Sequence, residues 1–159
     1  MIILSLDPGV ERTGFALFNK KDQNNFKYLT SGLVETSKTC TLPERLKSIY
    51  DTLAMIVLKY KPSHVVIERL FFSNNQKTAI AVAQAQGIIL LLAQQMKIDL
   101  SFLTPPQIKE IVTGYGGSDK KSVQKMLGLL DLKIPKNDLK QDDQADAIAC
   151  GYAICCLPM

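Results

Sequence analysis

The chain begins with MIILSLDPG (residues 1–9), and this stretch decides the fold. Its apolar run, residues 2–6, is nearly continuous, as in a central strand that is covered on both faces. The run stops at Asp7, and Pro8-Gly9 breaks the strand. A carboxylate at the end of a buried strand costs free energy unless it is paired or binds a metal. We therefore expect Asp7 to have a chemical role.

Three further segments extend this first strand into a sheet. Residues 13–18 alternate enough to predict a second strand, and the turn-rich residues 19–25 predict a hairpin into a third strand over 26–35. Such short connections favour antiparallel neighbours. The apolar run that ends at Glu68 predicts a fourth strand over 65–68. Because a helix precedes it, this strand is predicted to be parallel to the first.

Helices account for most of the remaining chain. Thr41 and Glu44 form a capping-box pattern, and the helix that they begin is amphipathic until Lys61-Pro62 ends it. The other predicted elements are a helix opened by Ser73 and ending near residue 97, a fifth strand over 98–103, a helix capped by Thr104 and ending near the glycine-rich loop 114–117, a helix capped by Ser118 and ending near residue 130, and a helix from about residue 142 to 156. One α/β domain over residues 1–159 accommodates all of them.

The helix that Ser73 opens is apolar nearly all round. A helix that is hydrophobic on every side is buried on every side. One of its faces can meet the sheet, and we expect the other to meet a second subunit in a homodimer. The alternative is a helix enclosed within one chain.

Composition limits the functional classes without choosing among them. Hydrophobic residues make up 47% of the chain, which predicts a packed core, and a net charge of +4 permits a nucleic-acid partner without requiring one. The four cysteines include no C-x-x-C pair and His64 is the single histidine, so we expect reduced thiols rather than a zinc site. No basic leader precedes Asp7, and no apolar run reaches the ~20 residues that span a bilayer. We expect a cytoplasmic protein with no membrane partner.

Four carboxylates stand out because their positions have no obvious structural purpose: Asp7, Glu68, Asp143 and Asp146. Asp143 and Asp146 are three residues apart in a predicted helix, so they share a face. Four such oxygen ligands suit hard divalent cations, and this predicts metal-assisted phosphodiester chemistry. The adjacent Asp142 is predicted to be the helix N-cap, where a carboxylate accepts backbone N–H bonds. The residues alone leave open which of Asp142 and Asp143 binds metal.

The order of these motifs resembles that of RuvC-type Holliday junction resolvases, in the ribonuclease H-like superfamily. The resemblance is carried by Asp7-Pro8-Gly9 with Thr13-Gly14, by Ile67-Glu68, by the glycine-rich loop with Lys120, and by DQADA (residues 143–147). It spans essentially the whole chain. It implies a ribonuclease H-like fold: a five-stranded mixed sheet, its first three strands antiparallel and the others parallel, flanked by helices on both faces.

The resemblance also implies an activity. It predicts a homodimeric, structure-specific endonuclease that nicks four-way junction DNA symmetrically in recombination and repair, leaving 5′-phosphate ends. Each active site would use two Mg²⁺ ions, with Mn²⁺ as a substitute, held by Asp7, Glu68, Asp143 and Asp146. A branch-migration motor is a further expected partner.

Several DNA-contacting residues follow from the same resemblance. Lys120 is predicted to act at the scissile phosphate and Lys109 to support DNA contact. The adjacent Lys121 is also a candidate DNA contact, and it leaves open which of the two neighbouring lysines acts at the phosphate. Phe71 aligns with a base-stacking aromatic residue, with Phe72 as its packing neighbour. Arg69 is a candidate phosphate contact.

Three other functions remain possible at this stage. The chain could be another ribonuclease H-like nuclease that acts on RNA or on other branched DNA, or a junction-binding protein without catalysis. The third is an actin-like phosphate loop, because Asp7-x-Gly9 after a strand also occurs there. That fold needs two such domains, and this chain has room for one.

Overall fold

The computed structural model describes residues 1–69 and 76–158. Its centre is a five-stranded sheet with the strand order β3-β2-β1-β4-β5. The strands are β1 (Ile2–Asp7), β2 (Arg12–Asp22), β3 (Asn25–Glu35), β4 (His64–Glu68) and β5 (Asp99–Leu103). Strand β2 is antiparallel to β1 and β3, whereas β4 is parallel to β1 and β5. The predicted mixed sheet is confirmed, including the direction of each strand.

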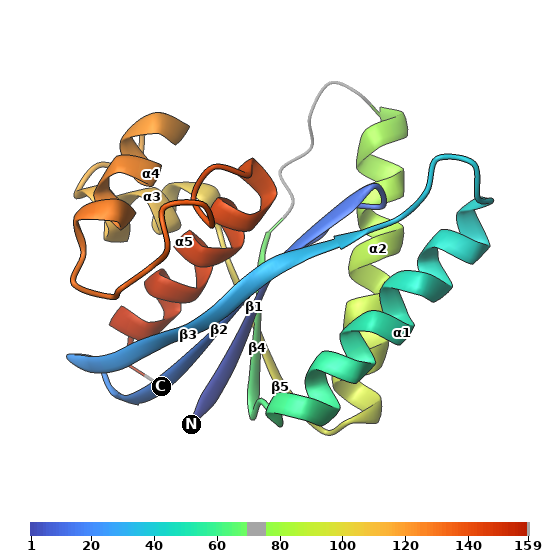
Figure 1. Ribbon diagram of the computed structural model, residues 1–159, viewed down its shortest axis with the longest axis horizontal. Coiled ribbons are helices and arrows are strands. Elements are labelled where there is room, and N and C mark those ends of the chain that lie inside the picture. Colours follow the sequence, from blue (N-terminus) through green and yellow to red (C-terminus); the bar gives the residue numbers. More distant parts are fainter. Residues whose placement is uncertain (70–75, 159) are drawn as a thin grey trace.

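Helices cover both faces of this sheet (Figure 1). They are α1 (Leu42–Tyr60), α2 (Gln76–Gln95), α3 (Pro105–Thr113), α4 (Lys120–Leu129) and α5 (Asp142–Cys156). Helices α1 and α2 lie on one side, and α3, α4 and α5 lie on the other. The prediction of helices on both faces is therefore confirmed.

The starts of α1 and α3 follow the predicted caps, whereas those of α4 and α5 do not. Thr41 and Thr104 each form a capping box before α1 and α3. The predicted cap at Ser118 is wrong, because Asp119 caps α4 and accepts a hydrogen bond of 2.8 Å from a backbone N–H of the first turn. Ser118 instead pairs with the hydroxyl of Thr113 at 2.7 Å. The predicted cap at Ser73 lies outside the described residues.

Alternating side chains give the sheet two different faces. On β1, Ile3 belongs to the core beneath α3, α4 and α5, whereas Leu4 and Leu6 belong to the core beneath α1 and α2. Ser5 also faces α5, because its hydroxyl donates to a carbonyl of that helix. By the same period of two, Asp7 projects on the α5 side of the sheet.

Helix α5 lies unusually close to the sheet. The hydroxyl of Ser5 donates to the carbonyl oxygen of Ala147 at 2.7 Å. A Cβ on Gly14 would stand 1.9 Å from the carbonyl oxygen of Asp143, and a Cβ on Gly151 would stand 2.5 Å from the Ser5 hydroxyl. Real Cβ atoms do not approach so closely, so the two glycines allow α5 to contact the strands directly.

Helix α2 has one buried and one exposed face. Ala85 and Ile89 are fully buried against the sheet and α1, whereas Ile80 is 61% exposed and Leu91 is 51% exposed. The alternative of a helix enclosed within one chain is therefore wrong, while burial of the exposed face by a second subunit stays a prediction. A short sheet and a single neighbouring helix cannot surround α2.

Two expectations from composition can be compared with the structure. Cys150 and Cys155 are buried in the core as free thiols, whereas Cys40 is exposed. Across residues 1–69 and 76–158, no helix combines the length and apolar character needed to cross a membrane.

Candidate active site

Asp7 and Glu68 occupy equivalent positions on neighbouring parallel strands. Leu6 pairs with Ile67, so the next residue along each strand is one of the two carboxylates. Glu68 follows Val66 with a period of two, and Val66 packs in the core on the α5 side. Both carboxylates therefore lie at the same edge of the sheet and on the same face.

The other two carboxylates reach this edge from the first turns of α5. Asp7 pairs across the sheet with Gly14, and Gly14 contacts the backbone of Asp143. Asp146 lies one turn further along the same helix face. The structure thus brings together the four carboxylates that were singled out from the sequence.

Their mutual repulsion is visible in their acidities. Burial, followed by the charges of Asp146, Glu68 and Asp143, raises the pKa of Asp7 to about 8. Burial and the charge of Asp146 raise the pKa of Glu68 to about 7. Burial also raises the pKa of Asp146, although a neighbouring lysine opposes the shift. Asp7, Glu68 and Asp146 are thus electrostatically coupled, and the charge of Lys120 offsets their burial and repulsion only in part.

The structure separates Asp142 from Asp143. The predicted capping role of Asp142 is wrong: Gln141 occupies the N-cap position with an extended backbone, and Asp142 is already the first helical residue. The Asp142 side chain is 66% exposed and accepts a hydrogen bond from Gln124 at 3.2 Å. Asp143 is 32% exposed and acts on the charge of Asp7, so its carboxylate faces the site.

Two cations contact the helix carboxylates. The ammonium of Lys120 lies 2.7 Å from Asp146, and the guanidinium Nε of Arg12 lies 3.2 Å from Asp143. Burial lowers the pKa of Lys120, but its hydrogen bond to Asp146 and the nearby carboxylates outweigh this effect and raise it. Among the described residues, no three acidic, histidine or cysteine side chains form a closed metal cage. The carboxylates face cations instead.

The donor set nevertheless suits a divalent cation. All of its ligands are carboxylate oxygens, which favour hard ions such as Mg²⁺ or Mn²⁺ over zinc. Burial, followed by repulsion from the other carboxylates, raises the pKa values of Asp7 and Glu68, and a bound divalent cation would stabilise their ionised forms. The residues present therefore fit a divalent metal.

A hollow of about 200 Å³ opens beside this group. Its lining includes Glu68, Asp146, Lys109 and Lys120. The two lysines predicted to serve DNA contact and cleavage are thus brought to the carboxylates. Lys121 is exposed and is not among the residues that line the hollow.

The other predicted DNA contacts are not at this hollow. The guanidinium of Arg69 lies 5.7 Å from the centre of the Phe102 ring and lines a separate hollow beside α2. Phe71 and Phe72 lie outside the described residues, so their predicted stacking and packing roles stay predictions.

Sequence reasoning missed Arg12. Arg12 shares the α5 side of β2 with Gly14 and Ala16, because every second residue of a strand faces the same way. That alternation was the available signal. It could not show that the chain would bring Asp143 to the same place.

A polar network that was also missed secures the first turn of α5. The side-chain amide of Gln144 donates to the Ser31 hydroxyl at 2.7 Å. Ser31 contacts the Tyr28 hydroxyl, which donates to Asp138 at 2.6 Å. The network joins α5 to β3 and to the loop before α5. It restrains the turn that carries Asp143 and Asp146.

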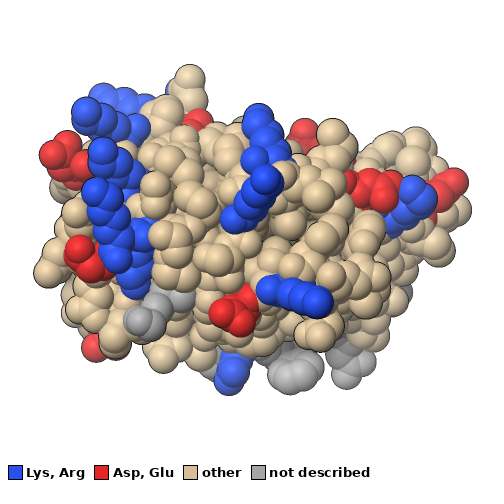
Figure 2. All heavy atoms as spheres, turned by 90° about the horizontal axis from the view of Figure 1, so that it is seen from below, with Lys and Arg blue, Asp and Glu red and all other residues tan. Residues whose placement is uncertain are grey.

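The surface charge is unevenly distributed. Lys and Arg side chains gather along one side of the face shown in Figure 2, the side on which α3 and α4 lie in Figure 1. Acidic side chains on this face are scattered. A concentration of positive charge on one side is the pattern expected of a surface that contacts a polyanion.

The sheet order, the helices on both faces and the carboxylates at the ends of β1 and β4 and the start of α5 define a ribonuclease H-like nuclease. The family model for "Crossover junction endodeoxyribonuclease RuvC" matches residues 3–156. The chain belongs to this family.

Individual relatives agree with this assignment. The RuvC protein of Alkaliphilus oremlandii is 44% identical over 157 residues, covering 98% of this chain and 92% of the relative. That of Caldicellulosiruptor saccharolyticus is 42% identical over 151 residues, covering 94% and 89%. Among solved structures, RuvC of T. thermophilus in complex with a Holliday junction substrate superimposes with a TM-score of 0.85 at 26% identity, covering 96% of this chain and 92% of that one. The yeast mitochondrial resolvase Ydc2, at 13% identity and a TM-score of 0.72, shares the fold and covers 96% of this chain and 77% of its own.

Proposed function

We propose that this protein resolves four-way DNA junctions by hydrolysing one phosphodiester bond in each of two strands. The observation that carries the proposal is the convergence of Asp7, Glu68, Asp143 and Asp146 beside Lys120, in a chain of the RuvC family. The T. thermophilus relative was solved with a Holliday junction substrate, which supports the same substrate here.

The proposed cofactor is a pair of divalent ions, Mg²⁺ or, as a substitute, Mn²⁺. Asp7 and Glu68 would hold them from the strands, and Asp143 and Asp146 from α5. Bound ions of this kind activate a water and stabilise the leaving oxygen of an in-line displacement. Departure of the 3′ oxygen leaves a 5′-phosphate and a 3′-hydroxyl.

The protein's own cations have a separate part in this scheme. If Asp146 held a metal, the ammonium of Lys120 would be free to contact a phosphate in the hollow that both residues line. Lys109 lines the same hollow and adds positive charge. Both lysines would thus bind and orient the phosphate, while Arg69 and Lys121, which do not line this hollow, would contact DNA elsewhere. Phe71 is proposed to stack on a DNA base.

A homodimer is proposed through the outer face of α2. That face presents Ile80, Leu90 and Leu91 to solvent, and a Cβ on Gly87 would meet nothing within 4 Å. A two-fold axis through this face would give two active sites, which suits a junction with matching symmetry. The dimer is proposed to act in the cytoplasm with a branch-migration motor.

Light scattering tests the dimer. Leu91→Glu places a charge on the proposed interface and should give a monomer, whereas Leu129→Glu on α4, at a side chain that is 70% exposed, should leave the dimer intact. A monomeric wild-type protein, or equal masses for both variants, would contradict the interface.

A cleavage panel tests the function. Four-way junctions, flaps, duplexes and RNA–DNA hybrids are incubated with wild-type protein with and without Mg²⁺. Selective, paired nicking of the junction is the expected result. Equal cutting of all substrates would instead indicate a general ribonuclease H-like nuclease. Glu68→Gln should bind the junction without cutting it, and a wild-type protein that binds but never cuts would indicate a binding protein.

A further inference from the structure

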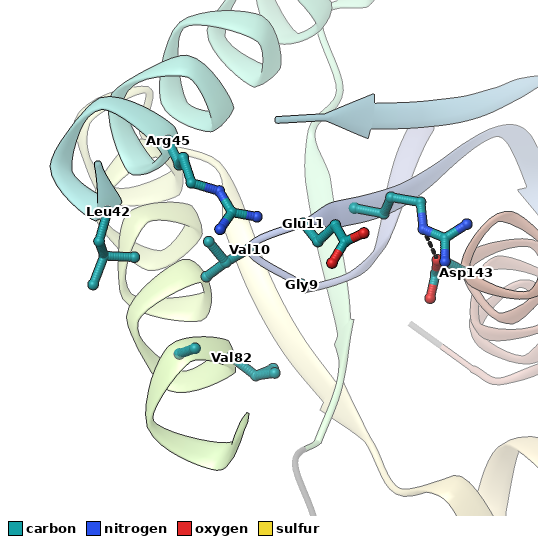
Figure 3. Close-up of a pocket in the computed structure, with 9 residues that line it drawn as sticks. Gly9, Val10, Glu11, Leu42, Arg45, Val82 and Asp143 are labelled. Atoms are coloured by element: carbon teal, nitrogen blue, oxygen red, sulfur yellow. Dashed lines mark ion pairs between the residues drawn. The ribbon is translucent and has the colours of Figure 1, made fainter. Parts of the chain in front are cut away.

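A second hollow lies on the other side of Asp143 from Lys120. It has a volume of about 480 Å³ and opens between the loop after β1 and the facing parts of α1 and α2 (Figure 3). Val10, Leu42 and Val82 give it an apolar wall. Because Asp143 also lines it, the hollow adjoins one of the four carboxylates of the candidate active site.

Two guanidinium groups flank this hollow from different elements. Figure 3 shows Arg45 reaching from α1 over the hollow toward Val10 and Glu11, and it marks the ion pair of Asp143 on the opposite side. That pair is made by Arg12 at 3.2 Å. Arginine suits phosphate groups, since its planar guanidinium can present several donors at once.

Arg45 is held in place but keeps donors free. Its Nε donates to the Thr36 hydroxyl at 2.8 Å, and that hydroxyl donates to the carbonyl of Val10 at 2.6 Å. Within residues 1–69 and 76–158, no hydrogen bond or ion pair engages the terminal nitrogens of Arg45. A restrained guanidinium with unused donors loses little freedom when an anion binds.

The acidic groups of the hollow are already neutralised. Glu11 forms an ion pair with Lys38 at 3.0 Å, and Asp143 is paired with Arg12. The hydrogen bond from Lys38 lowers the pKa of Glu11, and the charges of Arg12 and Arg45 lower it further, so this one carboxylate compensates Arg45 only in part.

We propose that this hollow binds a backbone phosphate of the cleaved strand, beside the scissile phosphate, with Arg45 as its ligand and the adjoining deoxyribose against Val10, Leu42 and Val82. This inference rests on the proposed action on DNA junctions and names a subsite of the same surface. If Asp143 held a metal instead of Arg12, the guanidinium of Arg12 would be free to contact the same phosphate.

Arg45→Ala tests the subsite, because Arg45 makes no contact with the carboxylates. Junction binding is measured in chelator over a range of salt concentrations. The expected results are a 3- to 10-fold weaker affinity, on the order of one lost phosphate contact, and a log–log salt slope that falls by about 0.9. Arg45→Lys keeps the charge and should restore the slope. Lys47→Ala is the matched control, since Lys47 lies two residues further along α1 and pairs with Asp51.

A methylphosphonate scan identifies the phosphate itself. Neutralising the correct phosphate should weaken binding of the wild-type protein and of Lys47→Ala, but leave Arg45→Ala unchanged. Circular dichroism melts of each variant exclude a folding defect. If Arg45→Ala and Lys47→Ala show the same affinity and slope, the subsite is wrong. If the wild-type protein shows no preference for junctions over duplex, the proposed function fails instead.

Discussion

Gly14 on β2 contacts the backbone of Asp143 on α5 so closely that a Cβ on Gly14 would stand 1.9 Å from the Asp143 carbonyl oxygen. Gly14 also pairs with Asp7 across the sheet. One small residue therefore lies between a strand carboxylate and a helix carboxylate, and it sets how near they can come.

Gly14→Ala should separate these two carboxylates. The backbone oxygen cannot move aside as a side chain can, so α5 must shift. We expect a loss of about 1–3 kcal/mol in the free energy of unfolding, and junction cleavage should fall at least tenfold. Gly128→Ala is the control, because its new Cβ would make an ordinary 3.6 Å contact with Leu139 and alanine favours a helix. Equal stability and activity of the two variants would contradict this account.

Asp7→Asn should stabilise the metal-free protein at neutral and alkaline pH. The pKa of the Asp7 carboxyl is near 3.8 in the unfolded chain and about 8 in the folded chain. Between these pH values the folded chain therefore binds more protons than the unfolded chain. Its stability therefore falls as pH rises from about 4 to about 8 and then levels off. The variant escapes this loss, which the rise of the Asp7 pKa from 3.8 to about 8 limits to at most about 6 kcal/mol. Thermal melts in chelator across this pH range measure it.

The control for this experiment is Asp51→Asn, which makes the same change in net charge on the outer side of α1. It should keep the wild-type dependence on pH. Parallel curves for wild type and Asp7→Asn would show that Asp7 is not the group responsible.

Metal binding should release protons near neutral pH. The pKa of Asp7 is about 8 and that of Glu68 about 7, so one or both are partly protonated at pH 7 in the metal-free protein. A divalent ion requires the carboxylate form, and its affinity should rise between about pH 6 and pH 9. Calorimetry in buffers with different ionisation enthalpies should show about one proton released at pH 7 and almost none above pH 9. An enthalpy that does not depend on the buffer would contradict this linkage.

Asp143→Asn and Asp142→Asn should behave differently although the residues are adjacent. Asp143 faces Asp7, while Asp142 is 66% exposed and contacts Gln124. The first change should lower single-turnover cleavage by roughly 100-fold or more, as expected for loss of a metal ligand, and the second should alter it by less than about threefold. The reverse order would make Asp142 the ligand.

Lys120→Ala and Lys121→Ala form a similar matched pair. Each removes one positive charge, but only Lys120 contacts Asp146 and lines the hollow beside Glu68. Cleavage should fall by about 100-fold for the first variant and by only a few fold for the second. Filter binding of the junction measures affinity separately, and similar losses there would show that the difference lies in cleavage. Equal cleavage by both variants would leave Lys120 without a special role.

The strand order and the strand carboxylates could be predicted because they depend on local signals. A buried run that ends in a carboxylate is visible at Asp7 and at Glu68, and connection lengths indicate the strand directions. The role of Asp142 could not be settled in this way, because N-cap and first helical residue differ by a single position. Periodicity does not define a boundary that sharply.

Contacts between distant segments were the other limit. Arg12 and Asp143 meet only because α5 packs against β2, and no spacing in the sequence records that approach. The apolar residues on the exposed face of α2 indicated burial, but no other part of the described chain covers that face. Its burial would need a surface from outside the chain.

The four carboxylates come from the first strand, the fourth strand and the last helix, so they span almost the whole chain. A nascent chain on the ribosome that has emerged as far as β5 carries Asp7 and Glu68 but neither helix carboxylate. If the four carboxylates are the catalytic set, such a chain would not nick DNA, and neither would a copy that had lost α5 to proteolysis. The proposed site would then make nuclease activity appear only when synthesis is nearly finished, so that incomplete copies stay inactive.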